Sequence, residues 1–182
     1  MRLTRTEPRR SSSKRIEPVI LFAIGKTRFA IAASSVDEIR SLDGLVACSM
    51  SSAYRSLRKV KFTFERNKKN YLVVDANLHF HTPPTQATRI LVLRNSSVAV
   101  LVDSIDRMCE LTAVRKLPQA FGGEERMWYR GLTVVGEELI PVVNPQAFLS
   151  KAETAVAITE LVGGRVAEEG IKIKTEKGAV SA

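Results

Sequence analysis

Apolar residues occur along most of this chain in short runs separated by residues typical of turns. The run from Val98 to Val102 is unbroken and rich in β-branched residues, so it predicts a strand buried on both faces. Asp103 ends this run. Beyond it Ile105, Met108 and Leu111 recur at wider spacing among charged residues. This second segment is expected to have one solvent-exposed edge and one edge that faces a core or a groove.

The N-terminal part of the pattern predicts a β-hairpin. Val19–Ile24 and Thr27–Ile31 are two apolar-rich segments separated by Gly25 and Lys26. Glycine at the first turn position suits a type II′ turn, because that position needs a positive φ. The following segment, Ser34–Arg40, predicts either a short helical turn or a connection into another strand.

Several later segments predict further strands and hairpins. Val60, Phe62 and Phe64 alternate with polar residues, which is typical of a half-buried strand. Pro141 cannot donate to a β-ladder, so its strand is expected at a sheet edge or with a bulge. The other predicted strands are Tyr71–Asp75, Ile90–Leu93, Leu132–Val135 and Leu139–Val143, with turns at Arg66–Lys69 and Gly136-Glu137.

Only one segment predicts a convincing helix, and it lies after the last strand. Asn144 is a good N-cap, Pro145 fits the first helical position, and Gly163-Gly164 is a stop signal. The predicted C-terminal α-helix spans residues 145–162, and its apolar face includes Phe148, Leu149, Ala152, Val156 and Leu161. So many short strands with one helix predict an all-β fold, either one barrel or a pair of barrels.

The charge distribution indicates which part of the chain folds. The 182 residues carry a net charge of +9, and many of the cations lie in residues 1–16, which predict a disordered basic arm. The folded domain is expected over residues 17–150, and residues 163–182, free of aromatic side chains, predict a disordered tail. No secretory signal or long apolar run is present, so we expect a soluble cytoplasmic protein.

No arrangement of reactive residues predicts catalysis. Cys48 and Cys109 have no partner spacing for a disulfide or zinc site, and His79 and His81 are expected to be solvated loop residues. Asp75 and Asp103 each follow a Val-rich strand, where a carboxylate ordinarily caps a turn. No phosphate-binding loop or nucleophile motif occurs, so the prediction is a non-enzyme without cofactor, metal or small-molecule substrate.

A basic segment leaves a second hypothesis open. The region from Arg55 to Lys69 is strongly basic, and Tyr54, Phe62 and Phe64 offer rings for stacking, so together with the arm it could bind single-stranded nucleic acid. Strand alternation places the two rings on the face away from Lys61, which favours a solvated basic face over a nucleic-acid interface.

Three blocks of sequence resemble the CheW family of chemotaxis coupling proteins. They are Val36–Arg40 after the Phe22/Phe29 hairpin, Val98–Met108 with Leu111-Thr112 and Pro118, and Arg130-Gly131-Leu132 through Gly136 to Asn144. Tyr71–Asp75 is similar to the family's strand ending in Val-Asp. Together these blocks span about residues 18–150 in the family's order.

The resemblance implies a fold of two intertwined, SH3-like, five-stranded β-barrel subdomains with a C-terminal helix. It also implies a non-catalytic adaptor that couples the cytoplasmic tip of methyl-accepting chemoreceptors to the regulatory domain of the histidine kinase CheA. The protein would then meet the membrane only through receptors. The receptor groove carried over from the family comprises Val36, Glu38, Ile39, Ile105 and Met108, and the kinase or array contact is Phe121.

One region departs from the family pattern. Before the Val-Asp strand the family typically has an Asn-Leu-Arg-Gly turn, whose Arg can pair with the Glu of the Val-x-Glu-Ile block. Here residues 62–69 contain no glycine, and Arg66 is the cation near the expected place. Whether Glu38 has a cationic partner therefore depends on Arg66, because the arginine of the family's turn is missing.

Overall fold

Eleven strands lie in two sheets in the computed structural model, which describes residues 16–50, 54–111 and 113–161. The first sheet has the order β10 (Tyr129–Val135), β11 (Glu138–Val143), β2 (Thr27–Ala32), β1 (Glu17–Ile24), β9 (Ser104–Leu111). The second has the order β3 (Val36–Arg40), β7 (Arg89–Leu93), β8 (Val98–Val102), β6 (Lys69–Asp75), β5 (Val60–Arg66), β4 (Val46–Ala47). The predicted all-β class is confirmed.

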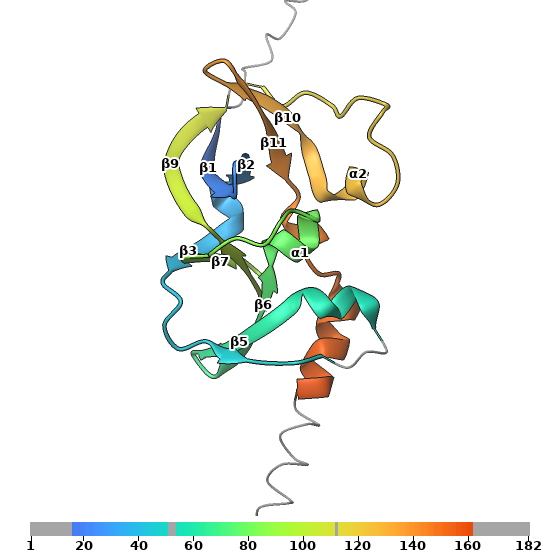
Figure 1. Cartoon of the computed structure of the whole chain (residues 1–182). Coiled ribbons are helices and arrows are strands. Elements are labelled where there is room, and N and C mark those ends of the chain that lie inside the picture. The colour runs from blue at the N-terminus through green and yellow to red at the C-terminus, as the bar shows by residue number, and fades with distance from the viewer. Residues whose placement is uncertain (1–15, 51–53, 112, 162–182) are drawn as a thin grey trace, which may run out of the picture.

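The chain builds the two subdomains in an interleaved order. It forms β1 and β2 of the first sheet, then all of the second sheet, and returns to the first sheet for β9, β10 and β11. The first sheet lies above the second in Figure 1, and the C-terminal helix runs beside the lower sheet. The predicted intertwining of the two subdomains follows from this order.

Three clusters of buried apolar residues explain the burial of the strands. The largest lies between the sheets and includes Phe22 and Phe29 from the first sheet and Leu72 and Val100 from the second. Each sheet also has a smaller cluster on its other face. We call the largest cluster the intersheet core.

β8 shows how the pattern of the sequence is satisfied. Val98, Val100 and Val102 face the intersheet core, whereas Ala99 and Leu101 belong to the cluster on the other face of the second sheet. All five residues are buried, so the predicted strand with two buried faces is confirmed.

The turns between the predicted hairpin strands have the required backbone geometry. Gly25 has a φ of 58°, and Asn67 and Lys68 have φ values of 52° and 61°. Two consecutive positive φ values are typical of a type I′ turn, which asparagine tolerates well. Arg66 and Lys69 are paired directly across this turn.

The segment after Asn144 differs from the predicted continuous helix. Asn144 caps a short 3₁₀ turn, η3 (Pro145–Ala147), and the α-helix described to residue 161 begins at residue 151. Ser150 and Glu153 form a capping box: the Ser150 hydroxyl accepts from Glu153 N at 3.2 Å, and the Glu153 carboxylate accepts from Ser150 N at 2.7 Å. This local cap starts a new helix instead of extending the turn.

Two further expectations about strands are corrected. β11, which contains Pro141, lies between β10 and β2 and not at an edge, and the bulge in its ladder with β10 lies on β10, at Arg130. Its ladder with β2 is a single pair, Val142 with Ala30. In β5 the register shifts at Lys61, so Val60 faces the intersheet core while Phe62 and Phe64 face the opposite side.

The remaining short elements are η1 (Ala33–Ser35), η2 (Arg55–Lys59), α1 (Ala76–Phe80) and α2 (Glu125–Trp128). No helix in the described ranges has both the length and the hydropathy of a membrane span. Apart from Ile16, the predicted basic arm and C-terminal tail lie outside the described residues.

Candidate functional site

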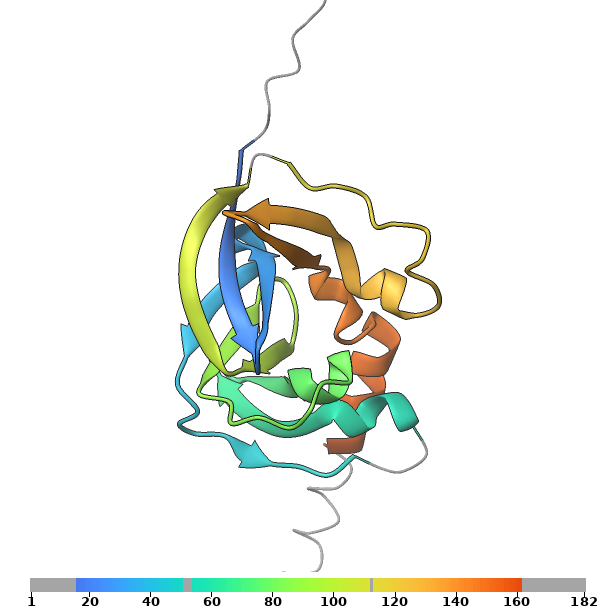
Figure 2. The same cartoon turned by 45° about the horizontal axis from the view of Figure 1, so that its top comes forward.

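Two edge strands carry the residues that the resemblance assigns to a receptor groove. β3 is one edge strand of the second sheet, and β9 is one edge strand of the first. Figures 1 and 2 place both strands on the same side of the molecule, with β3 near the beginning of β9. Glu38 and Ile39 belong to β3, and Ile105 and Met108 belong to β9.

A β-bulge at Asp106 brings Ile105 and Met108 to one face of β9. Ile105 lies opposite Phe22, and Met108 lies opposite Ile20, because the register shifts by one residue between them. Directly paired residues on antiparallel strands point to the same face. Phe22 and Ile20 both belong to the intersheet core, so Ile105 and Met108 also face that side. Without the extra residue, side chains three positions apart would point to opposite faces.

β3 repeats the same construction with a bulge at Asp37. Val36 lies opposite Leu93 and Ile39 opposite Leu91, and both partners belong to the intersheet core. Val36 and Ile39 therefore share a face. Glu38 lies opposite Val92, which belongs to the cluster on the other side of the sheet. The structure thus brings four of the five predicted receptor residues to the intersheet side and directs Glu38 away from them.

The four apolar residues differ in solvent exposure: two are packed against the intersheet core, and two are exposed and available to a partner. Val36 is 6% exposed, and Ile105 is half-buried against the intersheet core. Met108 is 63% exposed and Ile39 is 42% exposed. An exposed methionine and an exposed isoleucine, on sheet edges that lie on the same side of the molecule, suit a protein partner better than a reacting substrate.

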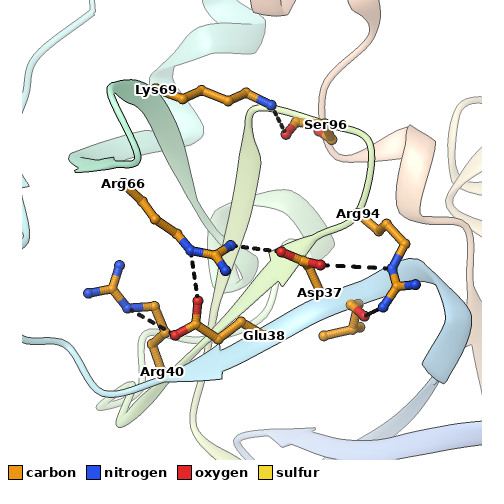
Figure 3. A network of polar contacts seen from close by, with 8 residues as sticks. Asp37, Glu38, Arg40, Arg66, Lys69, Arg94 and Ser96 are labelled. Atoms are coloured by element: carbon orange, nitrogen blue, oxygen red, sulfur yellow. Dashed lines mark hydrogen bonds and ion pairs between the residues drawn. The ribbon is translucent and has the colours of Figure 1, made fainter.

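Glu38 has a cationic partner in spite of the missing glycine-containing turn. The Arg66 guanidinium lies between two carboxylates, with Nη1 2.7 Å from Asp37 Oδ2 and Nε 3.2 Å from Glu38 Oε2 (Figure 3). Arg40 approaches Glu38 at 3.8 Å, and Arg94 approaches Asp37 at 4.0 Å. The hydrogen bond from Arg66 lowers the pKa of Asp37 below its ordinary value.

Phe121 lies outside both edge strands, in the segment between β9 and α2. Its ring is half-buried and lies 6.3 Å from the ring of Tyr129. Two hydrogen bonds hold the loop: Phe121 N donates to Pro118 O at 3.1 Å, and Nη1 of the Arg126 side chain donates to Phe121 O at 3.3 Å.

Comparison with known proteins identifies the family. A model of the CheW-like domain matches residues 18–153. The chain belongs to the CheW family. Its structure is similar to the crystal structure of scaffolding protein TtCheW from Thermoanaerobacter tengcongensis, with a TM-score of 0.63 and 10% identity over 77% of this chain and 97% of that chain. None of the curated proteins matches the chain.

Membership of the CheW family agrees with the absence of catalytic motifs from the sequence and indicates a chemotaxis scaffold or coupling protein. The two-subdomain, SH3-like fold implied by the resemblance is confirmed, with one difference in detail. The second sheet has six strands because the two-residue β4 is added beside β5.

The carboxylates that end the Val-rich strands are used structurally in this CheW family member. Asp75 is the N-cap of α1 and accepts from Asn77 N at 2.9 Å, as predicted. Asp103 accepts hydrogen bonds from Gly25 N and from the Thr85 hydroxyl, so it fastens the β1–β2 turn to the start of β9.

His79 is not a solvated loop residue, which corrects the sequence interpretation. It lies on α1 and is only 3% exposed, whereas His81 ends that helix and is exposed. The sequence missed this because Asp75 caps a short helix, α1, in a segment that was expected to be a loop. Among the described residues no group of three or more His, Cys, Asp or Glu side chains could hold a metal ion.

The aromatic residues of the basic segment are occupied within the fold. Phe64 is 4% exposed and stacks on Tyr71 at 5.0 Å, with Arg40 above the Phe64 ring at 4.7 Å. Phe62 is half-buried against the same cluster. Phe62 and Phe64 are therefore packed within the fold, and of the three rings Tyr54, 51% exposed, is the one open to stacking on a base.

Proposed function

We propose that this protein is a chemotaxis adaptor that couples methyl-accepting chemoreceptors to the histidine kinase CheA. The receptor's cytoplasmic tip would bind the apolar surface of β3 and β9, and a separate surface that includes Phe121 would contact the kinase. The observation that carries this proposal is the paired exposure of Ile39 and Met108 on two bulged edges, in a chain of the CheW family.

The exposed apolar side chains supply the binding free energy in this proposal. Burial of apolar surface contributes roughly 25 cal/mol per Å², and methionine adapts its shape to the partner. Val36 and Ile105 lie on the same faces of β3 and β9 as these side chains and pack against the intersheet core. The surface is therefore backed by rigid strands.

The ion pairs around Arg66 would form a polar rim beside this surface. Asp37 is the bulged residue of β3, and Arg66 ties it to the β5–β6 hairpin. A polar rim adds orientation and specificity more than affinity. In this role Glu38 would act from the edge of the interface and not from its apolar centre.

The test measures binding of the full chain to a purified receptor cytoplasmic fragment. Met108→Asp and Ile39→Asp should each weaken binding at least tenfold, because each places a charge in an apolar interface. Ile105 is a poorer test, since its side chain also contacts the intersheet core. Binding to the CheA regulatory domain should stay unchanged in both variants.

Val46→Asp is the matched control, because Val46 is 57% exposed on β4, at the other edge of the second sheet. It should bind the receptor fragment as the wild type does. Wild-type receptor binding by both Met108→Asp and Ile39→Asp would exclude the β3–β9 surface. Failure of the wild-type chain to bind either partner would exclude the coupling function itself.

A further inference from the structure

A second concave surface lies between η2, α1 and α2, in a part of the fold that the proposed receptor surface does not use. The cleft has a volume of about 580 Å³, and its lining includes Arg55, Arg58, Lys59, His79, His81 and Trp128. Volumes of roughly 300–1,000 Å³ are typical of small-molecule sites.

The positive charges of this cleft are not neutralised within the described part of the chain. Elsewhere in that part, five arginines form ion pairs: Arg28, Arg40, Arg66, Arg94 and Arg130. No described carboxylate lies within ion-pair distance of Arg55, Arg58 or Lys59, and Glu124 is the one acidic residue in the lining. Three cations on one short turn therefore converge on a cleft with little compensating charge.

Lys59 is the least solvated of the three cations. It is half-buried, and burial lowers its pKa, although Glu153 and Glu124 attract it from a distance. The Glu153 carboxylate is engaged by Ser150 N and by the Ser56 hydroxyl. A partly desolvated ammonium without a paired anion costs free energy, and an anionic ligand would offset that cost.

His79 orients this ammonium group. Lys59 Nζ lies 3.4 Å from His79 Nδ1, so the neutral ring accepts at Nδ1 and carries its proton on Nε2. His79 is 3% exposed, and its Nε2 has no hydrogen-bond partner among the described residues. Trp128 adds a half-buried aromatic wall, with ring centroids 5.0 Å from His79 and 5.3 Å from His81.

We propose that this cleft binds a soluble, phosphate-bearing small molecule, with Lys59, Arg55 and Arg58 around the phosphate and Trp128 against the organic part. Guanidinium groups match the geometry of phosphate oxygens in a bidentate manner, and an ammonium adds a point charge. The proposal does not depend on the receptor surface, because none of its residues lies on β3 or β9.

Trp128 is the single tryptophan of the chain, so its fluorescence reports directly on the cleft. The full chain is titrated with inorganic pyrophosphate at constant ionic strength. We expect a saturable change in the fluorescence of the wild type. The dissociation constant should rise at least tenfold in Lys59→Gln and in Arg58→Gln. Arg58 is exposed, so its variant keeps the test valid even if Lys59→Gln destabilises the fold.

Arg89→Gln is the matched control, since it removes the same charge from an exposed position at the start of β7, outside the cleft. It should bind pyrophosphate as the wild type does. The absence of a saturable change, or equal weakening in all three variants, would overturn the proposal. Binding of anionic vesicles or an acidic peptide through Lys59 and Arg58, without binding of pyrophosphate, would also overturn it.

Discussion

At the scale of single residues, burial determines the chemistry of His79. Its ring is packed among the rings of Phe80, Trp128 and Phe148, with centroid distances of 4.7, 5.0 and 4.8 Å. Loss of hydration lowers its pKa to about 3, and the nearby positive charge of Lys59 acts in the same direction. The folded state therefore holds His79 neutral under ordinary conditions.

This burial predicts a pH dependence of stability. The unfolded chain protonates His79 near its ordinary pKa of about 6.5, whereas the folded chain does so only near 3. The folded state therefore has the full stabilisation from its neutral His79 above pH 6.5. The free energy of unfolding then decreases as the pH falls from 6.5 toward 3, by at most about 1.4 kcal/mol per pH unit. Urea unfolding of wild type and His79→Gln between pH 7 and 4 measures it.

The variant should show a smaller decrease in the free energy of unfolding than the wild type over this range. The difference in the free energy of unfolding between His79→Gln and the wild type at pH 7 measures the packing that the substitution removes. Identical pH slopes in the two proteins would show that His79 takes up its proton equally in both states.

Arg66 illustrates what a family pattern alone leaves undecided. The sequence identifies the carboxylate, Glu38, and a nearby cation, but not whether the two meet. The type I′ turn at Asn67-Lys68 closes the β5–β6 hairpin directly after Arg66. That geometry allows the guanidinium to reach both Asp37 and Glu38. A tertiary contact of this kind depends on sheet register, which local sequence does not determine.

At the scale of elements, the bulges share a chemical feature. Each of the four register shifts within the described antiparallel ladders places a charged residue at the extra position: Asp37, Lys61, Asp106 and Arg130. Three of these form ion pairs, with Arg66, Arg28 and Glu17. A bulged residue leaves the regular alternation, so a charge there can reach solvent or a counterion.

The bulge of β10 also explains the Arg130-Gly131 pair of the sequence. Leu132 and Arg115 exchange backbone hydrogen bonds of 2.7 and 2.9 Å, which brings residues 113–115 against Gly131. A Cβ at Gly131 would collide with the Arg115 carbonyl oxygen and lie 2.7 Å from Val114 Cγ1. Gly131 is thus required by close packing of two backbone segments.

Gly131→Ala should therefore lower the free energy of unfolding by about 1–3 kcal/mol, measured by chemical denaturation. Gly122→Ala is the control, because a Cβ there meets no atom within 4 Å. Its effect should stay within about 0.5 kcal/mol. Equal stability of Gly131→Ala and the wild type would mean that the 113–115 segment moves aside without cost.

Hydrophobic patterning predicted most strands, because a run such as Val98–Val102 reports burial directly. It failed at bulges, since an alternating pattern cannot reveal an inserted residue. In β5 the pattern suggested one face for Val60, Phe62 and Phe64, and the bulge at Lys61 divides them. The start of the last helix was also missed, because Asn144 and Ser150 are both good N-caps and each caps a separate turn.

At the scale of the whole molecule, one core joins the two subdomains and the C-terminal segment. Aromatic rings cross the junction in contact, from Phe22 to Phe29 at 5.5 Å, to Phe80 at 4.7 Å and to Phe148 at 5.7 Å. These residues come from β1, β2, α1 and the segment after η3. Neither sheet can bury its inner face without the other.

The protein should consequently unfold in a single transition. Far-UV circular dichroism and Trp128 fluorescence, followed through the same denaturant series, are expected to give coincident curves. Phe80→Ala should shift both curves together and cost about 3–5 kcal/mol, because Phe80 is 7% exposed at the junction. Two separated transitions would show that one subdomain is stable alone.

The order of strands across the two sheets was accessible only through the resemblance. Local sequence cannot indicate that the chain leaves the first sheet and returns to it, nor that β3 and β9 reach the same side of the molecule. The composition of the proposed receptor surface therefore depends on topology as much as on its residues.

The bulges at Asp37 and Asp106 bear on how related sequences are aligned. Val36 and Ile39, like Ile105 and Met108, are three residues apart yet share a face. A regular strand achieves the same with a spacing of two. Deletion of the bulged residue would preserve the facing of both apolar side chains, so a one-residue gap at either position is compatible with an unchanged surface. Gaps placed there by sequence comparison need not indicate a different partner.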